Sequence, residues 1–175
     1  SLILENKSGT EAVLPGGLSM ELSADEILLG TAQAGQLGTL PQMVTAQALP
    51  LPLPGMVELA NGWVIRADWA ADSAFSQISQ NDDPWRAFGV LDEGEALWVR
   101  PFHPGERFHP LGMGGRSQRV ADLLSERKVA RDLRPLWPIV ATANHPVWIV
   151  GCHLDNRARV QAKSFRIVQL TCFRI

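Results

Sequence analysis

The chain has 175 residues, of which 46% are hydrophobic and 19% charged, a balance typical of one ordinary domain or two small ones. No apolar run approaches the roughly 20 residues that span a bilayer, so composition excludes a transmembrane, disordered or collagen-like chain. Two cysteines are too few for a disulfide scaffold, and no signal-like segment opens the chain, so we expect a cytoplasmic protein without a membrane partner. Because the chain begins with Ser1, we expect it to be a segment of a longer protein.

Charge divides the chain unevenly. Residues 1–95 carry a balance of −10 and residues 96–175 a balance of +8, within a total of −2. This polarity predicts an acidic, β-rich segment over 1–95 and a basic domain over 96–175, for which a polyanion is a natural partner. The alternative is a structural interaction module whose acidic and basic halves bind each other.

The first half of the chain predicts short strands separated by turns. We expect strands over 12–14, 18–22 and 27–29, with turns at Pro15-Gly16-Gly17 and Asp25. Residues 49–54 alternate Leu with Pro, which limits them to an edge strand or an extended connection. Strands over 56–59 and 63–67 flank Asn61-Gly62, a two-residue hairpin signal. The polar residues 70–84 predict a mobile loop or a subdomain junction.

The second half predicts one main helix among further strands. A strand over 96–99 leads into a loop rich in Pro and Gly that extends to Gly115. Ser117 is a suitable N-cap for a helix over 117–127 with Val120, Leu123 and Leu124 on its apolar face. A helical turn over 130–133 should end at Pro135, and later strands are expected over 139–142, 147–152, 159–160 and 164–171. Together these elements predict an α+β, β-dominated fold of two small subdomains, the second with the main helix.

Several residues have side chains suited to catalysis, but their spacing fixes no catalytic pairing. Ser117, Cys152 and Cys172 are the potential nucleophiles, and the four histidines are potential bases: His103, His109, His145 and His153. Neither a nucleophile elbow nor a triad spacing is present. Cys152 ends an apolar run, which favours a core position, and no spacing supports a metal site. We therefore predict neither a catalytic nor a metal site within this chain.

The glycine-rich stretch Gly112–Ser117 lies directly before the predicted helix, where free N–H groups and the helix dipole can hold a phosphate. Arg116 and Arg119 add forked donors to that helix start. They belong to a cluster of eight basic residues that we predict to bind RNA. Its members are Arg100, Arg107, Arg116, Arg119, Arg127, Lys128, Arg131 and Arg134.

Two features of this cluster leave alternatives open. A helical wheel places Arg127 inside the apolar arc, so either the helix ends before it or its side chain extends from a buried position to solvent. Four aromatic residues interleave with the cluster and could either stack on bases or belong to the core: Trp98, Phe102, Phe108 and Trp137.

Residues 97–172 resemble the C-terminal domain of tRNA(Ile)-lysidine synthetases. The resemblance rests on an ordered series of short motifs rather than on any one of them. The series runs through Val99-Arg100-Pro101, Pro104-Gly105-Glu106-Arg107-Phe108, Pro110-Leu111-Gly112-Met113, the predicted helix, Arg134 with Pro138, and Val147–Gly151. The first half is similar, more weakly, to the segment that precedes this domain, notably at Leu14-Pro15-Gly16-Gly17-Leu18.

The resemblance implies the tRNA-binding part of an ATP-dependent carbon–nitrogen ligase. The family joins lysine to the wobble cytidine of tRNA(Ile), using ATP with magnesium in an N-terminal catalytic domain that carries a Ser-Gly-Gly-x-Asp-Ser loop. Neither Gly16-Gly17-Leu18-Ser19 nor Gly114-Gly115-Arg116-Ser117 has the aspartate of that loop, so we expect this chain to bind no cofactor and to be inactive alone.

The family's C-terminal domain is similar to a domain of the phenylalanyl-tRNA synthetase β chain and contacts the acceptor stem. The implied partners are therefore the acceptor stem of tRNA(Ile) and the N-terminal catalytic domain of the same parent chain. An aminoacyl-tRNA editing-type hydrolase is the alternative, and it would need His103 or His109 to activate water.

Overall fold

The computed structural model describes residues 11–14, 18–22, 27–31, 38–71 and 74–175, and the chain forms two compact units, Ser1–Leu40 and Pro41–Ile175. The first unit contains an antiparallel sheet in the order β1 (Glu11–Leu14), β2 (Leu18–Leu22), β3 (Ile27–Thr31). These strands confirm the prediction for 12–14, 18–22 and 27–29. The predicted turns at Pro15-Gly16-Gly17 and Asp25 lie outside the described residues.

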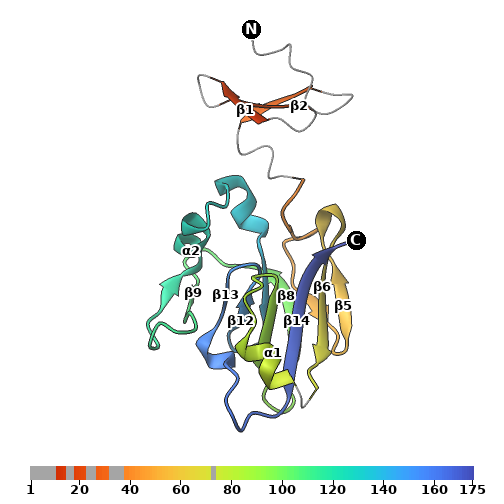
Figure 1. Ribbon diagram of the computed structural model, residues 1–175, viewed down its shortest axis with the longest axis vertical. Helices are drawn as coiled ribbons and strands as arrows, with labels where there is room; N and C mark the ends of the chain where they lie inside the picture. The colour runs from red at the N-terminus through yellow and green to blue at the C-terminus, as the bar shows by residue number, and fades with distance from the viewer. Residues whose placement is uncertain (1–10, 15–17, 23–26, 32–37, 72–73) are drawn as a thin grey trace. The chain divides into compact units, whose positions relative to one another are not determined.

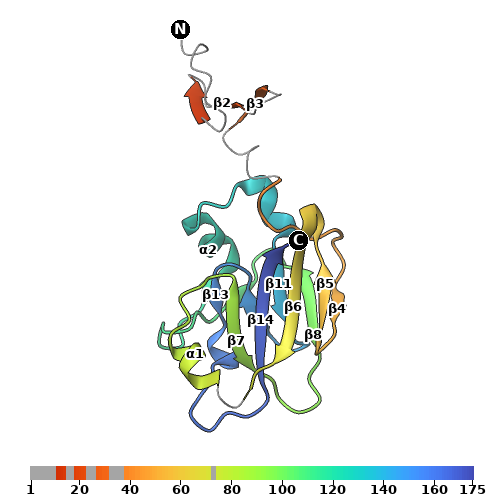
Figure 2. The same ribbon diagram turned by 45° about the vertical axis from the view of Figure 1, so that its right-hand side comes forward.

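The second unit is built from a five-stranded and a four-stranded antiparallel sheet. The five-stranded sheet has the order β13 (His153–Leu154), β12 (Pro146–Ile149), β11 (Pro138–Ala141), β8 (Leu97–Pro101), β4 (Leu49–Leu51). The four-stranded sheet has the order β5 (Gly55–Glu58), β6 (Trp63–Trp69), β14 (Ile167–Arg174), β7 (Arg86–Val90). Figure 2 shows β7, β14 and β6 lying in front of β11 and β8, so the two sheets form a sandwich.

Both sheets contain strands from the acidic and the basic part of the sequence. β4 pairs with β8, and β6 and β7 pair with β14. The compact units divide between Leu40 and Pro41, whereas the charge balance changes near residue 95. The change from acidic to basic composition therefore runs through one folded unit instead of separating two.

The main core lies between the two sheets. Val99 and Val140 of one sheet are buried in the same cluster as Ile65, Val168 and Leu170 of the other. All residues of β11 and β12 are buried, so both faces of these strands are covered. A second apolar layer lies outside this main cluster and includes buried residues of α2 (Val120–Glu126) and of the 3₁₀ helix η4 (Arg131–Leu136).

The predicted hairpin and edge strand are confirmed. β5 and β6 pair from Gly55 opposite Ala67 to Glu58 opposite Val64, and a 3₁₀ turn, η2 (Ala60–Gly62), joins them. Asn61 and Gly62 have φ of 58° and 75°, the left-handed region that this dipeptide tolerates. The turn is longer than two residues because Leu59 N–H bonds to the Trp63 carbonyl. β4, with Pro50 at its centre, lies at the edge of its sheet.

The helical predictions need correction at their ends. The main helix begins at Val120 instead of Ser117, because Gln118–Arg119 form β10 and pair with β9 (Arg107–Phe108). It ends at Glu126. The turn predicted over 130–133 extends through Pro135 as η4, which ends at Leu136.

Other differences fall in segments with weak sequence patterns. The predicted loop 70–84 contains a short helix, α1 (Phe75–Ser79). The strand predicted over 159–160 is absent: these residues follow the 3₁₀ turn η5 (Asn156–Ala158) as irregular backbone. β7 was not predicted, and its Gly89 lies where a Cβ would contact Val147 and Ala158. Glycine inside a strand marks such a close approach and weakens the strand pattern.

The observed architecture is the predicted α+β, β-dominated fold, with α2 and β9 to one side of the sheets in Figure 1. Among the described residues, no helix is long and apolar enough to cross a membrane.

Candidate nucleic-acid interface

The two-stranded ribbon of β9 and β10 places two arginines side by side. Arg107 lies directly opposite Arg119 in the antiparallel ladder, and both side chains are exposed. Phe108, the next residue, is 0% exposed and anchors the ribbon in the protein. Like charges directly opposite each other in a ladder are destabilising. The ribbon therefore places two positive charges next to each other although their repulsion opposes folding.

The guanidinium of Arg107 is fixed by Ser117. Its Nε donates to Ser117 Oγ at 2.9 Å, and its Nη2 donates to the Ser117 carbonyl at 3.1 Å. Ser117 therefore orients Arg107 instead of capping a helix, and Arg119 occupies the N-cap position of α2 without a side-chain cap. These two bonds leave the remaining N–H groups of Arg107 available to a partner.

The glycine loop before this ribbon makes a tight turn. Gly112, Gly114 and Gly115 have positive φ, which a residue with a side chain rarely adopts. Arg116 follows the loop and is exposed. The ribbon strand Gln118–Arg119 separates the loop from α2, so the loop does not lead directly into a helix as the sequence predicted.

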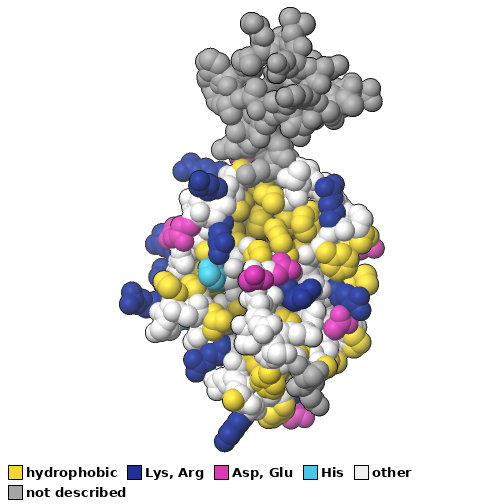
Figure 3. Space-filling view, viewed as in Figure 1, with side chains coloured by type: hydrophobic (Ala, Val, Ile, Leu, Met, Phe, Trp, Pro, Cys, Tyr) yellow, Lys and Arg dark blue, Asp and Glu magenta, His cyan; other side chains and the backbone are white. Residues whose placement is uncertain are grey.

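A second group of basic residues follows the helix. Arg127 is the C-cap of α2 and is exposed, so the helix ends before it and the uncertainty over its place in the apolar arc is resolved. Lys128 has φ of 58° and is exposed, as is Arg131 at the start of η4. We name six exposed residues the cationic surface: Arg107, Arg116, Arg119, Arg127, Lys128 and Arg131. Figure 3 shows Lys and Arg side chains along the side of the molecule that carries β9 and α2 in Figure 1.

The other two predicted residues have partners within the protein. Arg100 donates through Nη2 to Glu106 Oε1 at 2.6 Å and through Nη1 to Glu106 Oε2 at 3.0 Å, and the two side chains are 16% and 12% exposed. Arg134 donates through Nε to the Val129 carbonyl at 2.9 Å. Both therefore support the segments that carry the cationic surface.

The Arg100–Glu106 pair closes the turn that leads into β9. Glu106 Oε2 also accepts the backbone N–H of His103 at 2.8 Å. Burial alone would raise the pKa of the Glu106 carboxyl, but the hydrogen bonds from Arg100 and His103 and the charge of Arg100 outweigh burial and lower it. Glu106 is thus a carboxylate at neutral pH and holds the turn closed.

A buried carboxylate that sequence analysis did not select fixes the other side of the ribbon. Asp155 is 0% exposed and accepts the backbone N–H groups of His109 and Arg157 at 3.0 and 2.9 Å. It also accepts Nε and Nη2 of Arg157 at 2.9 and 2.8 Å. Asp155 caps η5, and an aspartate ahead of a short helical turn is the signal that could have identified it.

The two cysteine thiols are not activated. Burial raises the pKa of the Cys152 thiol to about 11 and that of the Cys172 thiol to about 12, so both are protonated at neutral pH. His109 Nδ1 is buried without a hydrogen-bond partner, and His103 Nδ1 lies 3.8 Å from Glu106 Oε2. Within the described part of the chain, no group of three or more His, Cys, Asp or Glu is arranged to hold a metal.

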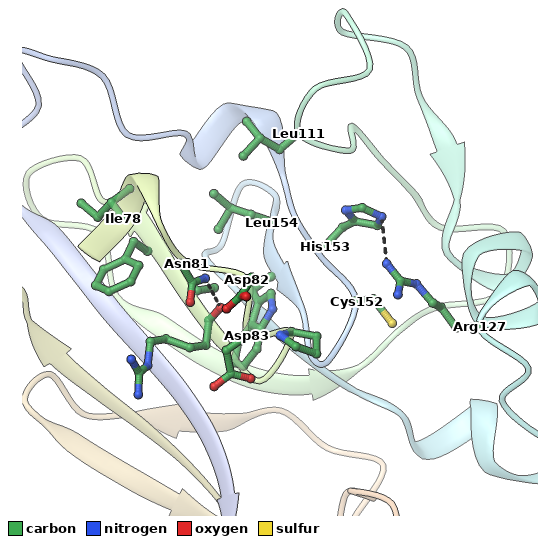
Figure 4. Close-up of a pocket in the computed structure, with 14 residues that line it drawn as sticks. Ile78, Asn81, Asp82, Asp83, Leu111, Arg127, Cys152, His153 and Leu154 are labelled. Atoms are coloured by element: carbon green, nitrogen blue, oxygen red, sulfur yellow. Dashed lines mark hydrogen bonds between the residues drawn. The ribbon is translucent and has the colours of Figure 1, made fainter. Parts of the chain in front are cut away.

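Cys152 and His153 line a cavity of about 420 Å³ beside the cationic surface. In Figure 4, His153 meets Arg127 on one wall of this cavity, and Asp82 and Asp83 lie on the other. Arg127 Nη2 lies 3.3 Å from His153 Nε2. Burial and the neighbouring Arg127 charge lower the pKa of His153, which keeps the imidazole neutral and able to accept from Arg127.

The structure separates the four interleaved aromatic residues. Phe108 and Trp137 are 0% and 2% exposed and belong to the core. Phe102 is half-buried, and Trp98 is 37% exposed. Only Trp98 of these four therefore presents a large part of its ring to solvent.

Comparison with known proteins gives consistent matches. Residues 97–169 match the family model described as "TilS substrate C-terminal domain". The chain is 32% identical over 129 residues to a tRNA(Ile)-lysidine synthase of Symbiobacterium thermophilum, covering 71% of this chain and 26% of that protein. It is 27% identical over 170 residues to the synthase of Geobacter sulfurreducens, covering 93% and 32%. The chain thus spans about a third or less of these relatives.

A solved structure shares the fold. The structure titled "Crystal structure of TILS C-terminal domain" superposes with a TM-score of 0.59 at 23% identity, covering 74% of this chain and 98% of that one.

Proposed function

We propose, from the match of residues 97–169 to the TilS substrate C-terminal domain model, that the chain is the tRNA-binding C-terminal part of a tRNA(Ile)-lysidine synthetase. In this proposal it holds the acceptor stem of tRNA(Ile) while an N-terminal catalytic domain of the parent chain ligates lysine to the wobble cytidine. That domain, not this chain, would bind ATP, magnesium and lysine.

The observation that carries the proposal is the arginine pair of the β9–β10 ribbon. Arg107 and Arg119 lie opposite each other and are exposed, and Arg107 is oriented by two bonds to Ser117. A phosphate between two such side chains would offset their mutual repulsion and accept forked hydrogen bonds from each. The negative charge of a phosphate backbone thus complements the positive charge of Arg107 and Arg119.

The rest of the cationic surface suits duplex RNA. The deep major groove of an A-form stem is closed to side chains, so recognition rests on phosphates, 2′-hydroxyl groups and shape. Arg116 follows the glycine loop, and Arg127, Lys128 and Arg131 follow α2. These residues would position the tRNA and leave its bases to be read elsewhere.

Binding across a salt series to tRNA(Ile) and to a minihelix of its acceptor stem tests the proposal. With roughly five phosphates neutralised, we expect log affinity to fall with a slope near −4.5 against log salt. Equal affinity for the two RNAs would place the contact on the stem. No binding by the 175-residue chain at low salt, or loss of binding when the stem is presented alone, would contradict the acceptor-stem assignment.

A matched pair of double variants tests the residues. Replacing Arg107 and Arg119 with Ala should lower affinity at least tenfold and reduce the magnitude of the salt slope by about two. Replacing Arg159 and Lys163 with Ala removes the same charge from the segment between η5 and β14 and should change affinity little. Equal losses in both variants would mean that net charge, not this surface, drives binding.

A further inference from the structure

The open ring of Trp98 lies on the outer side of the five-stranded sheet. Its neighbours in the ladder are Ala141 on β11 and Pro50 on β4, and neither side chain is large enough to cover an indole. Trp98 is 37% exposed although it lies on β8, between two other strands. Exposure of an apolar ring to water is unfavourable, and no neighbouring side chain within the described sheet covers this one.

Trp98 forms part of a cavity of about 510 Å³. His103 on the turn before β9, residues 142–145 between β11 and β12, and Pro146 at the start of β12 contribute to its walls. Arg100 and Glu106 also line it, but their charges are paired with each other. The Glu106 carboxylate that lines this cavity is therefore neutralised by Arg100.

Asn144 presents a fixed amide to the same cavity. Its Nδ2 donates to Glu95 Oε1 at 3.1 Å, and its backbone N–H donates to Thr142 Oγ1 at 3.2 Å. One amide N–H and the Oδ1 oxygen remain for a ligand. An asparagine amide in this state matches the adjacent N6 amine and N7 acceptor on the major-groove edge of adenine, whereas that edge shows two acceptors in guanine and one in uracil.

We propose that the Trp98 cavity binds one unpaired nucleotide of the RNA, with its base stacked on the indole and, where the base is adenine, its edge bonded to Asn144. A duplex cannot enter a cavity of this size, so the nucleotide must be unpaired, and the single-stranded end next to a stem supplies such a nucleotide. The turn that carries His103 and Glu106 continues directly into β9 and Arg107, so the cavity borders the cationic surface.

The second cavity is less suited to this ligand. The cavity of Figure 4 also borders the cationic surface through Arg127, but Asp82 and Asp83 are exposed on its wall and would repel a phosphate backbone. It also lacks a ring as open as that of Trp98, because its aromatic residues, Phe88 and Trp148, are 4% and 2% exposed. Aromatic stacking therefore favours the Trp98 cavity.

The first test does not depend on duplex binding. The indole N–H resonance of Trp98, identified by its absence in Trp98→Phe, is followed by NMR while tetraadenylate or tetrauridylate is added at millimolar concentration. We expect a shift that saturates at lower concentration with tetraadenylate, and Asn144→Ala should remove this preference. An unperturbed Trp98 resonance with both oligonucleotides would overturn the proposal.

The second test uses the proposed function, on which the choice of RNA rests. A minihelix with four unpaired nucleotides at its 3′ end is compared with a blunt one. The extension should raise affinity about tenfold for the unmodified chain and for Phe165→Ala, which removes another exposed ring. Trp98→Ala should abolish this gain, and Trp98→Phe should retain most of it.

The outcomes separate the two proposals. If the unpaired extension raises the affinity of Trp98→Ala as much as that of the unmodified chain, the nucleotide site is overturned and the stem contact is unaffected. A Trp98 resonance that responds to tetraadenylate while neither minihelix binds supports the nucleotide site and overturns the stem contact instead.

Discussion

The sandwich and the layer that carries the cationic surface are stabilised by different means. The sandwich buries aliphatic side chains from both sheets, and its long ladder between β6 and β14 runs from Trp69 opposite Val168 to Trp63 opposite Arg174. The segment 101–137 has the two-residue strands of its ribbon and two short helices, and polar residues fix it: Glu106 at one turn and Asp155 at another. Burial of apolar side chains thus stabilises the sandwich, while the hydrogen-bonded carboxylates of Glu106 and Asp155 fix the turns that position the basic side chains.

The largest expected effect is in the sandwich. Leu170 is 0% exposed, and its ladder neighbours are the small residues Ala67 and Ala87, which cannot fill a vacated space. Leu170→Ala should lower the free energy of unfolding by about 2–5 kcal/mol. Urea denaturation measures it, with Thr171→Ala, a half-buried neighbour, as the control expected to lose far less. Equal losses in the two variants would contradict the assignment of Leu170 to the central core.

Asp155→Asn should lower the free energy of unfolding by less than Leu170→Ala. Its effect should fall on the segment 101–137 that carries the cationic surface. The amide cannot accept all four hydrogen bonds that the carboxylate receives, and Arg157 loses its charged partner. We expect a loss of about 2–3 kcal/mol in unfolding free energy. Hydrogen exchange should show the residues around His109 opening at lower free energy than the β6–β14 ladder. Uniform opening of both regions would show that the layer is no less stable than the sandwich.

The same carboxylate predicts how stability depends on pH. Burial alone would raise the pKa of Asp155, but its hydrogen bonds from Arg157 and from backbone N–H groups, together with the Arg157 charge, outweigh burial and lower it below 3.8. The stabilisation is therefore complete above the unfolded-state value and is lost as pH falls through the lower folded-state pKa. Asp155→Asn should remove this part of the acid dependence. An unchanged acid profile in that variant would assign the dependence to other groups.

The sandwich was the more predictable of the two regions. The apolar run at the start of residues 63–67 and the Asn61-Gly62 turn are local signals. A proline within Leu49–Leu51 restricts that strand to an edge whatever its neighbours are. β7 was not predicted because Gly89 interrupts its apolar pattern. A side chain at this position would contact Val147 and Ala158, which are far away in sequence.

The layer was predictable in composition but not in geometry. The sequence identifies eight basic residues, yet nothing local indicates that Arg100 pairs with Glu106 across a turn or that Arg107 lies opposite Arg119. Ser117 fits an N-cap by residue type, and only the pairing of β10 with β9 shows that it orients Arg107 instead. Likewise, burial of Phe108 and Trp137 separates them from Trp98, although all four interleaved aromatic residues look alike in sequence.

The smallest expected effect has the opposite sign to the others. Replacing Arg119 with Thr removes the like charge opposite Arg107 and places a β-branched residue in a strand, so the unfolding free energy should rise by roughly 0.2–1 kcal/mol. Arg116→Thr, in the loop before the ribbon, should leave stability unchanged. Both variants should bind the minihelix more weakly, because each loses one phosphate contact. If only Arg119→Thr both gains stability and loses affinity, the arginine pair is unfavourable for folding and is needed for binding. If Arg119→Thr destabilises the chain instead, the arginine pair contributes to folding, and its place in the proposed interface loses its main support.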